Sequence, residues 1–262
     1  MDLGLAGKKA ILVGAARGIG YSVAEVLARE GCDIALTARS EDSVKDAVAS
    51  LSKYGTKVVG KPVNAKQPEA YKEWIDWAIE ELDGVDILVP FTSAGGGMGS
   101  EKYWYNAFET DVMAVVRAVE GVIEKMTEQQ RGSIVLLGTT STGEAMGGPQ
   151  PYNAMKASLI TWGKQLALWH GKNGIRVNVV NPDAVIRGSR IWDGKWKEER
   201  AASNKIDADD VEEFYRKRSM LKLAVLPEDI AEAVYFFASD KSGKSTGNIL
   251  NVDAGNAAAF TR

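Results

Sequence analysis

A tyrosine and a lysine lie four residues apart in the stretch YNAMK, as Tyr152 and Lys156. If this stretch is helical, residues i and i+4 share one face, so the phenol and the ammonium lie close together. A nearby ammonium stabilises the phenolate and lowers the pKa of the tyrosine from its usual value of about 10. Such a tyrosine can act as a general acid in carbonyl reduction or as a general base in alcohol oxidation. The alternative interpretation is that both are ordinary helix residues.

A glycine-rich stretch, GAARGIG, follows the apolar run at 10–13. Gly14 can form a tight turn, Gly18 leaves room for a pyrophosphate, and Gly20 allows close packing of the next helix on the strand. Ile19 lies in the first turn of that helix, where free N–H groups and the positive end of the helix dipole favour phosphates. By itself the pattern also fits a plain turn between a strand and a helix.

Two arginines flank the place where a dinucleotide would lie. The apolar run at 34–37 is followed by Ala38 and Arg39, at the point where an acidic residue would bind the ribose 2′-hydroxyl of NAD. An arginine there suits a 2′-phosphate instead, and Arg17 in the glycine-rich turn could bind the same phosphate. The sequence therefore predicts a preference for NADP(H), with NAD(H) possible. The alternative is two solvated surface arginines.

Apolar runs alternate with helical patterns along most of the chain. We expect strands at 10–13, 34–37, 58–59, 85–89, 134–137, 175–180 and 249–252. We expect helices at 19–30, 41–54, 68–82, 101–127, 151–172 and 227–239. Such alternation predicts an α/β fold with a doubly wound parallel sheet of about seven strands, buried on both faces. Residues 1–262 are expected to form a single Rossmann-like domain.

One segment, residues 187–222, breaks this alternation and is rich in Arg, Lys, Trp and Glu. We expect it to form a helical lid over the substrate. Arg187 and Arg190 would suit a carboxylate or phosphate, and Trp192 offers a flat apolar face to a sugar or an aromatic ring. The alternative is an amphipathic helix with solvated charges.

Composition excludes several classes of protein. The 262 residues have a net charge of −3, which does not favour nucleic acid or an anionic membrane. No apolar run is long enough to span a bilayer. Cys32 is the single cysteine and His170 the single histidine, so neither an internal disulfide nor a His-rich metal site is expected. No stretch resembles a signal peptide, and we expect a reducing, cytoplasmic location.

Four motifs in this order resemble the short-chain dehydrogenase/reductase family over nearly the whole chain. GAARGIG resembles the nucleotide loop of that family, and YNAMK resembles its active-site pair. GIRVNVVNPDAV resembles its sixth strand and the loop that contacts nicotinamide, which includes Val185. STGNILNVDAG resembles its last strand. The resemblance implies that Tyr152 transfers a proton and that Lys156 both lowers the pKa of that tyrosine and binds the nicotinamide ribose.

The resemblance also implies two further catalytic positions. The active-site hydroxyl of the family, usually a serine, corresponds to Thr139, with Thr140 and Ser141 as alternatives. The asparagine of its long central helix corresponds to Asp111. Family members use this residue through its backbone carbonyl, which an aspartate can retain, while the added charge could change the pKa of the tyrosine.

Other cofactor contacts follow from the same resemblance, with departures from the family pattern. The Asn-Asn-Ala-Gly that usually follows the fourth strand is absent, and Ala94 and Gly95 in PFTSAGGG are expected to face the cofactor instead. Asn64 occupies the place where the family usually has an acidic residue near the adenine.

These features predict an NADP(H)-dependent oxidoreductase that interconverts a carbonyl and a secondary alcohol. NPDAVIRGSRIW and the C-terminal GNAAAFTR resemble the sugar-acting dehydrogenase domains fused to rhamnulose-phosphate aldolases, which implies a sugar, polyol or sugar acid as substrate. An apolar or aromatic ketone is the alternative substrate. The alternative from another class is a nucleotide-sensing regulatory protein with reduced turnover.

The two long predicted helices, 101–127 and 151–172, carry more apolar residues than one buried face needs. Among them are Val115, Val119, Leu159 and Trp169. Large exposed apolar patches usually mark interfaces, and the resemblance implies pairing of these helices across a two-fold axis. We therefore expect a homo-oligomer, a tetramer before a dimer. The alternative is that these side chains face the sheet.

Overall fold

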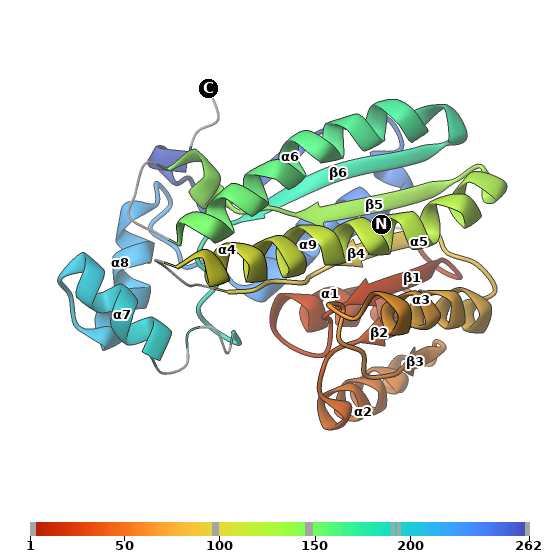
Figure 1. Ribbon diagram of the computed structural model, residues 1–262, viewed down its shortest axis with the longest axis horizontal. Coiled ribbons are helices and arrows are strands. Elements are labelled where there is room, and N and C mark those ends of the chain that lie inside the picture. The colour runs from red at the N-terminus through yellow and green to blue at the C-terminus, as the bar shows by residue number, and fades with distance from the viewer. Residues whose placement is uncertain (1–3, 96–99, 145–148, 190–191, 193–194, 260–262) are drawn as a thin grey trace.

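One parallel sheet organises the part of the chain that the computed structural model describes, namely residues 4–95, 100–144, 149–189, 192 and 195–259 (Figure 1). Its seven strands lie in the order β3-β2-β1-β4-β5-β6-β7. The strands are β1 (Lys9–Val13), β2 (Asp33–Thr37), β3 (Val58–Gly60), β4 (Ile87–Pro90), β5 (Gly132–Leu137), β6 (Ile175–Pro182) and β7 (Ile249–Val252). Each predicted strand is present, so the doubly wound α/β fold is confirmed.

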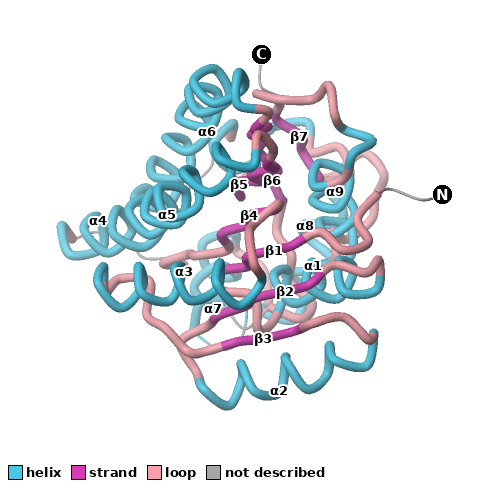
Figure 2. The backbone as a smooth tube through the Cα atoms, turned by 90° about the vertical axis from the view of Figure 1, so that its right-hand side faces the viewer, coloured by secondary structure: helices cyan, strands magenta, loops and turns pink. Residues whose placement is uncertain are grey.

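Helices cover both faces of this sheet (Figure 2). On one face lie α1 (Gly18–Arg29), α2 (Glu41–Leu51) and α9 (Pro227–Ala238). On the other face lie α3 (Pro68–Leu82), α5 (Ala114–Gln129) and α6 (Gln150–His170). The strand order reverses between β1 and β4, which is the point where such sheets bind ligands at the carboxyl ends of their strands.

The first strand shows why the sheet is buried on both sides. Ala10 and Leu12 pack with the α1 and α9 side, whereas Ile11 and Val13 pack with the α3 and α5 side. Successive side chains of a strand point to opposite faces, so a continuous apolar run fills two cores. Both cores hold the strands and their ends in place.

The helix predicted at 101–127 is present, but it is not α-helical throughout. It consists of α4 (Glu101–Ala107), a π-helical turn (Phe108–Met113) and α5, which extends to Gln129. A π-turn inserts one residue into a helix without changing its apolar pattern enough for a sequence reading to detect it. The turn contains Asp111, whose side chain is fully buried.

The apolar surplus on these helices is smaller than predicted. Val115, Val119 and Leu159 are buried against the sheet, so using them as evidence for an interface was wrong. Trp169, by contrast, is 58% exposed near the end of α6, next to Leu168 at 74%. Further exposed apolar side chains on α4 and the π-turn are Tyr103, Trp104, Tyr105 and Phe108.

The segment that interrupts the alternation is helical, as predicted. It contains α7 (Lys195–Asn204) and α8 (Val211–Arg218), which lie at the end of the molecule toward which the chain leaves β6 (Figure 1). Ala201, Val211 and Tyr215 form a small core of its own. Backbone hydrogen bonds from Met220 to Gly255 and from Leu221 to Ala254 attach its base to the chain that follows β7.

Candidate active site

The first turns of α6 place Tyr152 and Lys156 together. Pro151 is the second residue of the helix, in the first turn, where its missing N–H costs no hydrogen bond. The ammonium of Lys156 lies 5.9 Å from the centre of the Tyr152 ring, so the i, i+4 prediction is confirmed. The lysine is almost fully buried and donates hydrogen bonds to the carbonyl oxygens of Leu137 (3.1 Å) and Thr92 (3.3 Å).

Asp111 forms a buried ion pair with this lysine. Its Oδ1 lies 3.6 Å from the ammonium of Lys156, and the two side chains are 0% and 4% exposed. The carboxylate also accepts a hydrogen bond of 3.3 Å from the backbone N–H of Ala94. The π-turn thus connects α6 with the loop after β4, and such turns are frequent at functional sites.

The electrostatics of this cluster depend on its burial. Burial raises the pKa of Asp111, and the nearby Lys156 opposes this effect. Burial lowers the pKa of Lys156, and Asp111 opposes that effect. Each charge of the pair is therefore maintained chiefly by the other, because neither is well solvated.

The pKa of Tyr152 is raised above its usual value, first by burial and then by the Asp111 carboxylate. A hydrogen bond with the Thr139 side chain acts in the opposite direction. The expected lowering of this pKa by Lys156 is therefore wrong for the structure, because the lysine charge is directed to Asp111 and to two carbonyl groups. The phenol stays protonated, which is the form that a general acid needs.

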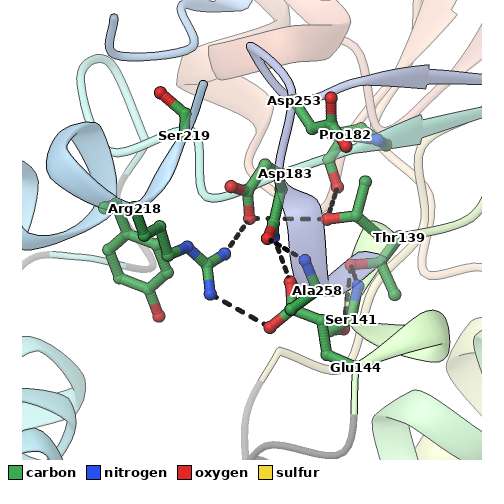
Figure 3. Close-up of polar contacts among 12 residues, drawn as sticks. Thr139, Ser141, Glu144, Pro182, Asp183, Arg218, Ser219, Asp253 and Ala258 are labelled. Carbon is green, nitrogen blue, oxygen red and sulfur yellow. Dashed lines mark hydrogen bonds and ion pairs between the residues drawn. The ribbon is translucent and has the colours of Figure 1, made fainter. Parts of the chain in front are cut away.

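The hydroxyls after β5 divide into two groups (Figure 3). The Thr139 hydroxyl lies 3.0 Å from that of Ser141, and Thr139 also acts on Tyr152, whose pKa it lowers. Ser141 donates to the side-chain oxygen of Asn153 on α6 (2.8 Å). Thr140 faces β6 instead and donates toward the Pro182 carbonyl and the Asp183 carboxylate, both at 3.4 Å. Of the three candidate hydroxyls, Thr139 is the one that the structure brings to the tyrosine.

The glycine-rich turn has the geometry that a dinucleotide requires. Gly14 and Gly18 have positive φ angles of 78° and 56°, which glycine adopts without strain. A Cβ on Gly20 would lie 2.7 Å from the Cα of Ala15, so no larger residue fits. Ile19 follows in the first turn of α1, whose N-terminus points to the carboxyl edge of the sheet. These residues fit a nicotinamide dinucleotide.

The two predicted phosphate-binding arginines lie at the same edge. Arg17 is exposed and forms the N-cap of α1, and Arg39 is exposed directly after β2. Asn64 lies beside them, because the N–H of Val63 bonds to the Ala38 carbonyl. The side-chain oxygen of Asn64 accepts from the N–H of Lys66 (3.1 Å), which fixes its own turn.

The remaining predicted cofactor contacts surround the catalytic cluster. Ala94 and Gly95 line a small hollow together with Tyr152; its other lining residues are Tyr103, Asn106, Ala107 and Pro151. Val185 is 5% exposed and pairs with Val225 in a short parallel bridge. It can therefore meet a cofactor mainly through its backbone.

Two of the predicted substrate residues, Arg187 and Trp192, make contacts within the region that contains α7 and α8. Arg187 forms a two-pronged ion pair with Glu212, with contacts of 2.9 and 2.6 Å. The Trp192 ring packs edge-on against Tyr215, with centres 5.6 Å apart. Arg190 lies outside the described residues. Contacts of these residues with a substrate stay predictions.

The sequence reading missed a second charged cluster beside Thr139. Glu144, Asp183 and Arg218 meet there from three separate parts of the chain (Figure 3), and Asn256 joins them from a fourth by a hydrogen bond to Glu144. The only sequence signal is the aspartate in NPDAV, and nothing in its spacing indicates its partner. Within the described ranges, no group of three or more His, Cys, Asp or Glu side chains is placed to hold a metal ion. In the same ranges, no helix is long and apolar enough to cross a membrane.

Comparison with known proteins agrees with this geometry. Residues 14–257 match a short-chain dehydrogenase/reductase family model described as enoyl-(acyl carrier protein) reductase. The uncharacterized oxidoreductase YuxG of Bacillus subtilis is 35% identical over 97% of this chain, which spans 38% of the length of that relative. L-Sorbose reductase from Gluconobacter frateurii, solved with NADPH and L-sorbose, is 30% identical, with a TM-score of 0.88 and 98% of both chains covered.

A further solved structure is similar over nearly the whole chain. Carveol dehydrogenase from Mycobacterium avium, solved with NAD, is 27% identical with a TM-score of 0.89, and 96% of this chain and 98% of that chain are covered. The sheet order, the glycine-rich turn, the Tyr152–Lys156 pair and these similarities lead to one assignment. The chain belongs to the short-chain dehydrogenase/reductase family, whose members are oxidoreductases that act on CH–OH groups with NAD or NADP.

Proposed function

We propose that this protein is an NADP(H)-dependent enzyme that interconverts a carbonyl and a secondary alcohol of a sugar, polyol or sugar acid. The observation that carries the proposal is the cluster of Tyr152, Lys156, Asp111 and Thr139 at the carboxyl edge of the sheet. A proton donor, a hydroxyl and a buried cation meet there, at the same edge of the sheet as the glycine-rich turn.

The bound cofactor supplies a hydride for reduction or accepts one in oxidation. Tyr152 donates its phenolic proton to the substrate oxygen in reduction and accepts that proton in oxidation. Thr139 donates a hydrogen bond to the same oxygen. Lys156 holds the nicotinamide ribose, and Asp111 together with two carbonyl groups fixes the position of the ammonium.

Preference for NADP(H) is proposed from Arg17 and Arg39. Both are exposed at the edge where the adenosine ribose would lie, and neither β2 nor the two residues that follow it place an acid there. The planar guanidinium of arginine can donate two hydrogen bonds to one phosphate. It is also weakly hydrated, so its own desolvation costs little free energy. The similarity to L-sorbose reductase with NADPH supports the same cofactor and a sugar-like substrate.

A second candidate substrate is an apolar ketone. Tyr103, Ala107 and Pro151 give the hollow beside Tyr152 an apolar part, next to the polar groups of Asn106 and Tyr152. Such an apolar part can contact a substrate that carries few hydroxyls. NADPH and NADH oxidation should be measured over a panel of ketoses, sugar acids and cyclic ketones. Turnover of none of them, with tight cofactor binding, would favour the nucleotide-sensing protein.

We also propose that the protein assembles as a closed homo-oligomer, a tetramer before a dimer. Its proposed location is the cytoplasm. Aromatic side chains are exposed on α4 and the π-turn, and Leu168 and Trp169 are exposed near the end of α6. Met220, Leu221, Leu223, Phe236 and Leu250 are exposed as well, on and around α9 and β7. Exposed apolar side chains on two sides of the sheet suit two different two-fold axes.

A further inference from the structure

Arg218, the last residue of α8, joins two carboxylates from distant parts of the chain. Its Nη1 lies 3.0 Å from Oε2 of Glu144, and its Nη2 donates to Oδ1 of Asp183. The side chains of Arg218, Glu144 and Asp183 are only 15%, 3% and 9% exposed. Figure 3 shows the guanidinium directed between the two acids.

Two further contacts complete this cluster. The guanidinium carbon lies 4.4 Å from the centre of the Tyr215 ring, one turn earlier on α8. Asn256 donates from its side-chain amide to the other oxygen of Glu144. The loop after β5, the end of β6, the end of α8 and the chain after β7 are therefore connected through one set of side chains.

Removal of Arg218 would leave two carboxylates largely out of water without their cation, an arrangement that proteins avoid. The planar guanidinium can direct separate N–H groups at two carboxylates, and Tyr215 holds its plane. A lysine ammonium would keep the charge but not this forked geometry. The site is therefore specific for arginine.

Both acids contact the turn that carries the hydroxyls of the candidate active site, Glu144 as its last residue and Asp183 through the Thr140 hydroxyl. We call residues 139–144 the hydroxyl turn. Glu144 ends it, and the N–H of Glu144 bonds to the Ser141 carbonyl (3.3 Å). The N–H of Ser141 in turn bonds to the Thr139 hydroxyl (3.3 Å). Asp183 faces the Thr140 hydroxyl from the side of β6. Arg218 thus acts on both sides of the hydroxyl turn.

We propose that Arg218 is a positioning residue that clamps the hydroxyl turn to the end of α8 and thereby sets where Thr139 meets the substrate oxygen. The kinetic consequence rests on the proposed function, whereas the structural consequence does not. The competing interpretation is an ion network that only stabilises the fold. These two interpretations differ in what happens when all the charges are removed together.

The first experiment measures hydrogen–deuterium exchange in the full-length protein, with and without NADPH. Arg218→Met should raise amide exchange in the hydroxyl turn and in α8, with little change around α1. Arg216→Met is the matched control, because Arg216 lies on the same helix and pairs with Glu213 at 2.5 Å on the surface. Unchanged exchange of the hydroxyl turn in Arg218→Met would overturn the clamp, even if no substrate is known.

The second experiment uses the substrate that the panel identifies. Arg218→Met should lower kcat/KM roughly 10- to 100-fold, as expected for a misplaced reacting group, while the Kd for NADPH changes less than about threefold. Arg218→Lys keeps the charge, and it should regain most of the lost thermal stability but little of the lost kcat/KM. It also serves as the test if Arg218→Met does not fold.

The triple variant Glu144→Gln/Asp183→Asn/Arg218→Met removes the unpaired charges. If Arg218 positions the turn, thermal stability recovers and kcat/KM stays low. Recovery of both would show that charge compensation was its whole role and would overturn the proposal. If the unaltered protein reduces no compound of the panel, the proposed function fails. The exchange experiment still decides whether Arg218 clamps the hydroxyl turn to the end of α8.

Discussion

The substitution Asp111→Asn tests the electrostatics of the active site most directly. It replaces a buried carboxylate with an amide of the same shape, 3.6 Å from the Lys156 ammonium. The carboxylate is one of the causes that raise the pKa of Tyr152. Loss of this charge should therefore lower the pKa of the tyrosine. The position of Lys156 should be retained, because its hydrogen bonds to two carbonyl groups are unchanged.

The sign of the pH effect follows from the form of Tyr152 that reacts. Reduction needs the protonated phenol, so its rate declines as the pH rises through the tyrosine pKa. Oxidation needs the phenolate, so its rate increases over the same interval. In Asp111→Asn, both transitions should move to lower pH. The variant should lose reductase activity in alkaline buffer and gain dehydrogenase activity there, relative to the unaltered protein.

The size of the stability change follows from the ion pair. Two unit charges 3.6 Å apart attract by about 4–5 kcal/mol at an effective dielectric constant of about 20. Desolvation of both groups offsets part of this, and loss of one partner of a buried pair typically costs 3–5 kcal/mol. Because the amide oxygen can still accept a hydrogen bond, we expect a loss of about 3 kcal/mol. For a chain of this size, Tm should fall by roughly 6–12 °C.

Rates in both directions should be recorded from pH 6 to pH 11 or so, with Tm measured by calorimetry. Asp86→Asn is the matched control, because Asp86 is also buried and pairs with Arg131 at 2.6 Å, but at the opposite edge of the sheet. This control should lose stability without any change in the pH profile. Superimposable profiles for Asp111→Asn and the unaltered protein, or a shift to higher pH, would refute the reasoning.

Four further predictions concern the proposed function. Tyr152→Phe should reduce turnover to below a few per cent with the NADPH Kd nearly unchanged, because only the proton-carrying oxygen is lost; substantial residual activity would contradict its role. Arg39→Asp should reduce the preference for NADPH over NADH, by roughly 1.5–3 kcal/mol in the ratio of the kcat/KM values, because a charged hydrogen bond to the phosphate is replaced by an acceptor; an unchanged ratio would remove Arg39 from the phosphate site. Gly20→Val should abolish cofactor binding and lower Tm, since its Cβ would lie 2.7 Å from the Ala15 Cα, and calorimetric titration with NADPH measures this. Sedimentation at micromolar concentration should give about four times the chain mass of 28.3 kDa, and a single species at the mass of one chain would contradict the proposed assembly.

The features that the sequence predicted correctly are local or periodic. Seven apolar runs became seven strands because each run fills two cores, and alternation with helices forces them to be parallel. The glycine-rich turn follows from backbone angles that only glycine adopts easily at Gly14 and Gly18. The proximity of Tyr152 and Lys156 follows from the pitch of one helix.

The features that the sequence did not predict depend on distant side chains and on burial. The raised pKa of Tyr152 arises because the fold removes water and places the Asp111 carboxylate nearby, through a π-turn that leaves no trace in the apolar pattern. Arg187, expected to contact substrate, has Glu212 as its ion-pair partner 25 residues away. Arg218 meets Glu144 and Asp183 across 74 and 35 residues. The sequence by itself thus determined the sheet, the nucleotide turn and the catalytic pair, whereas only the tertiary structure decided which charges face each other, because no spacing rule links side chains from separate segments.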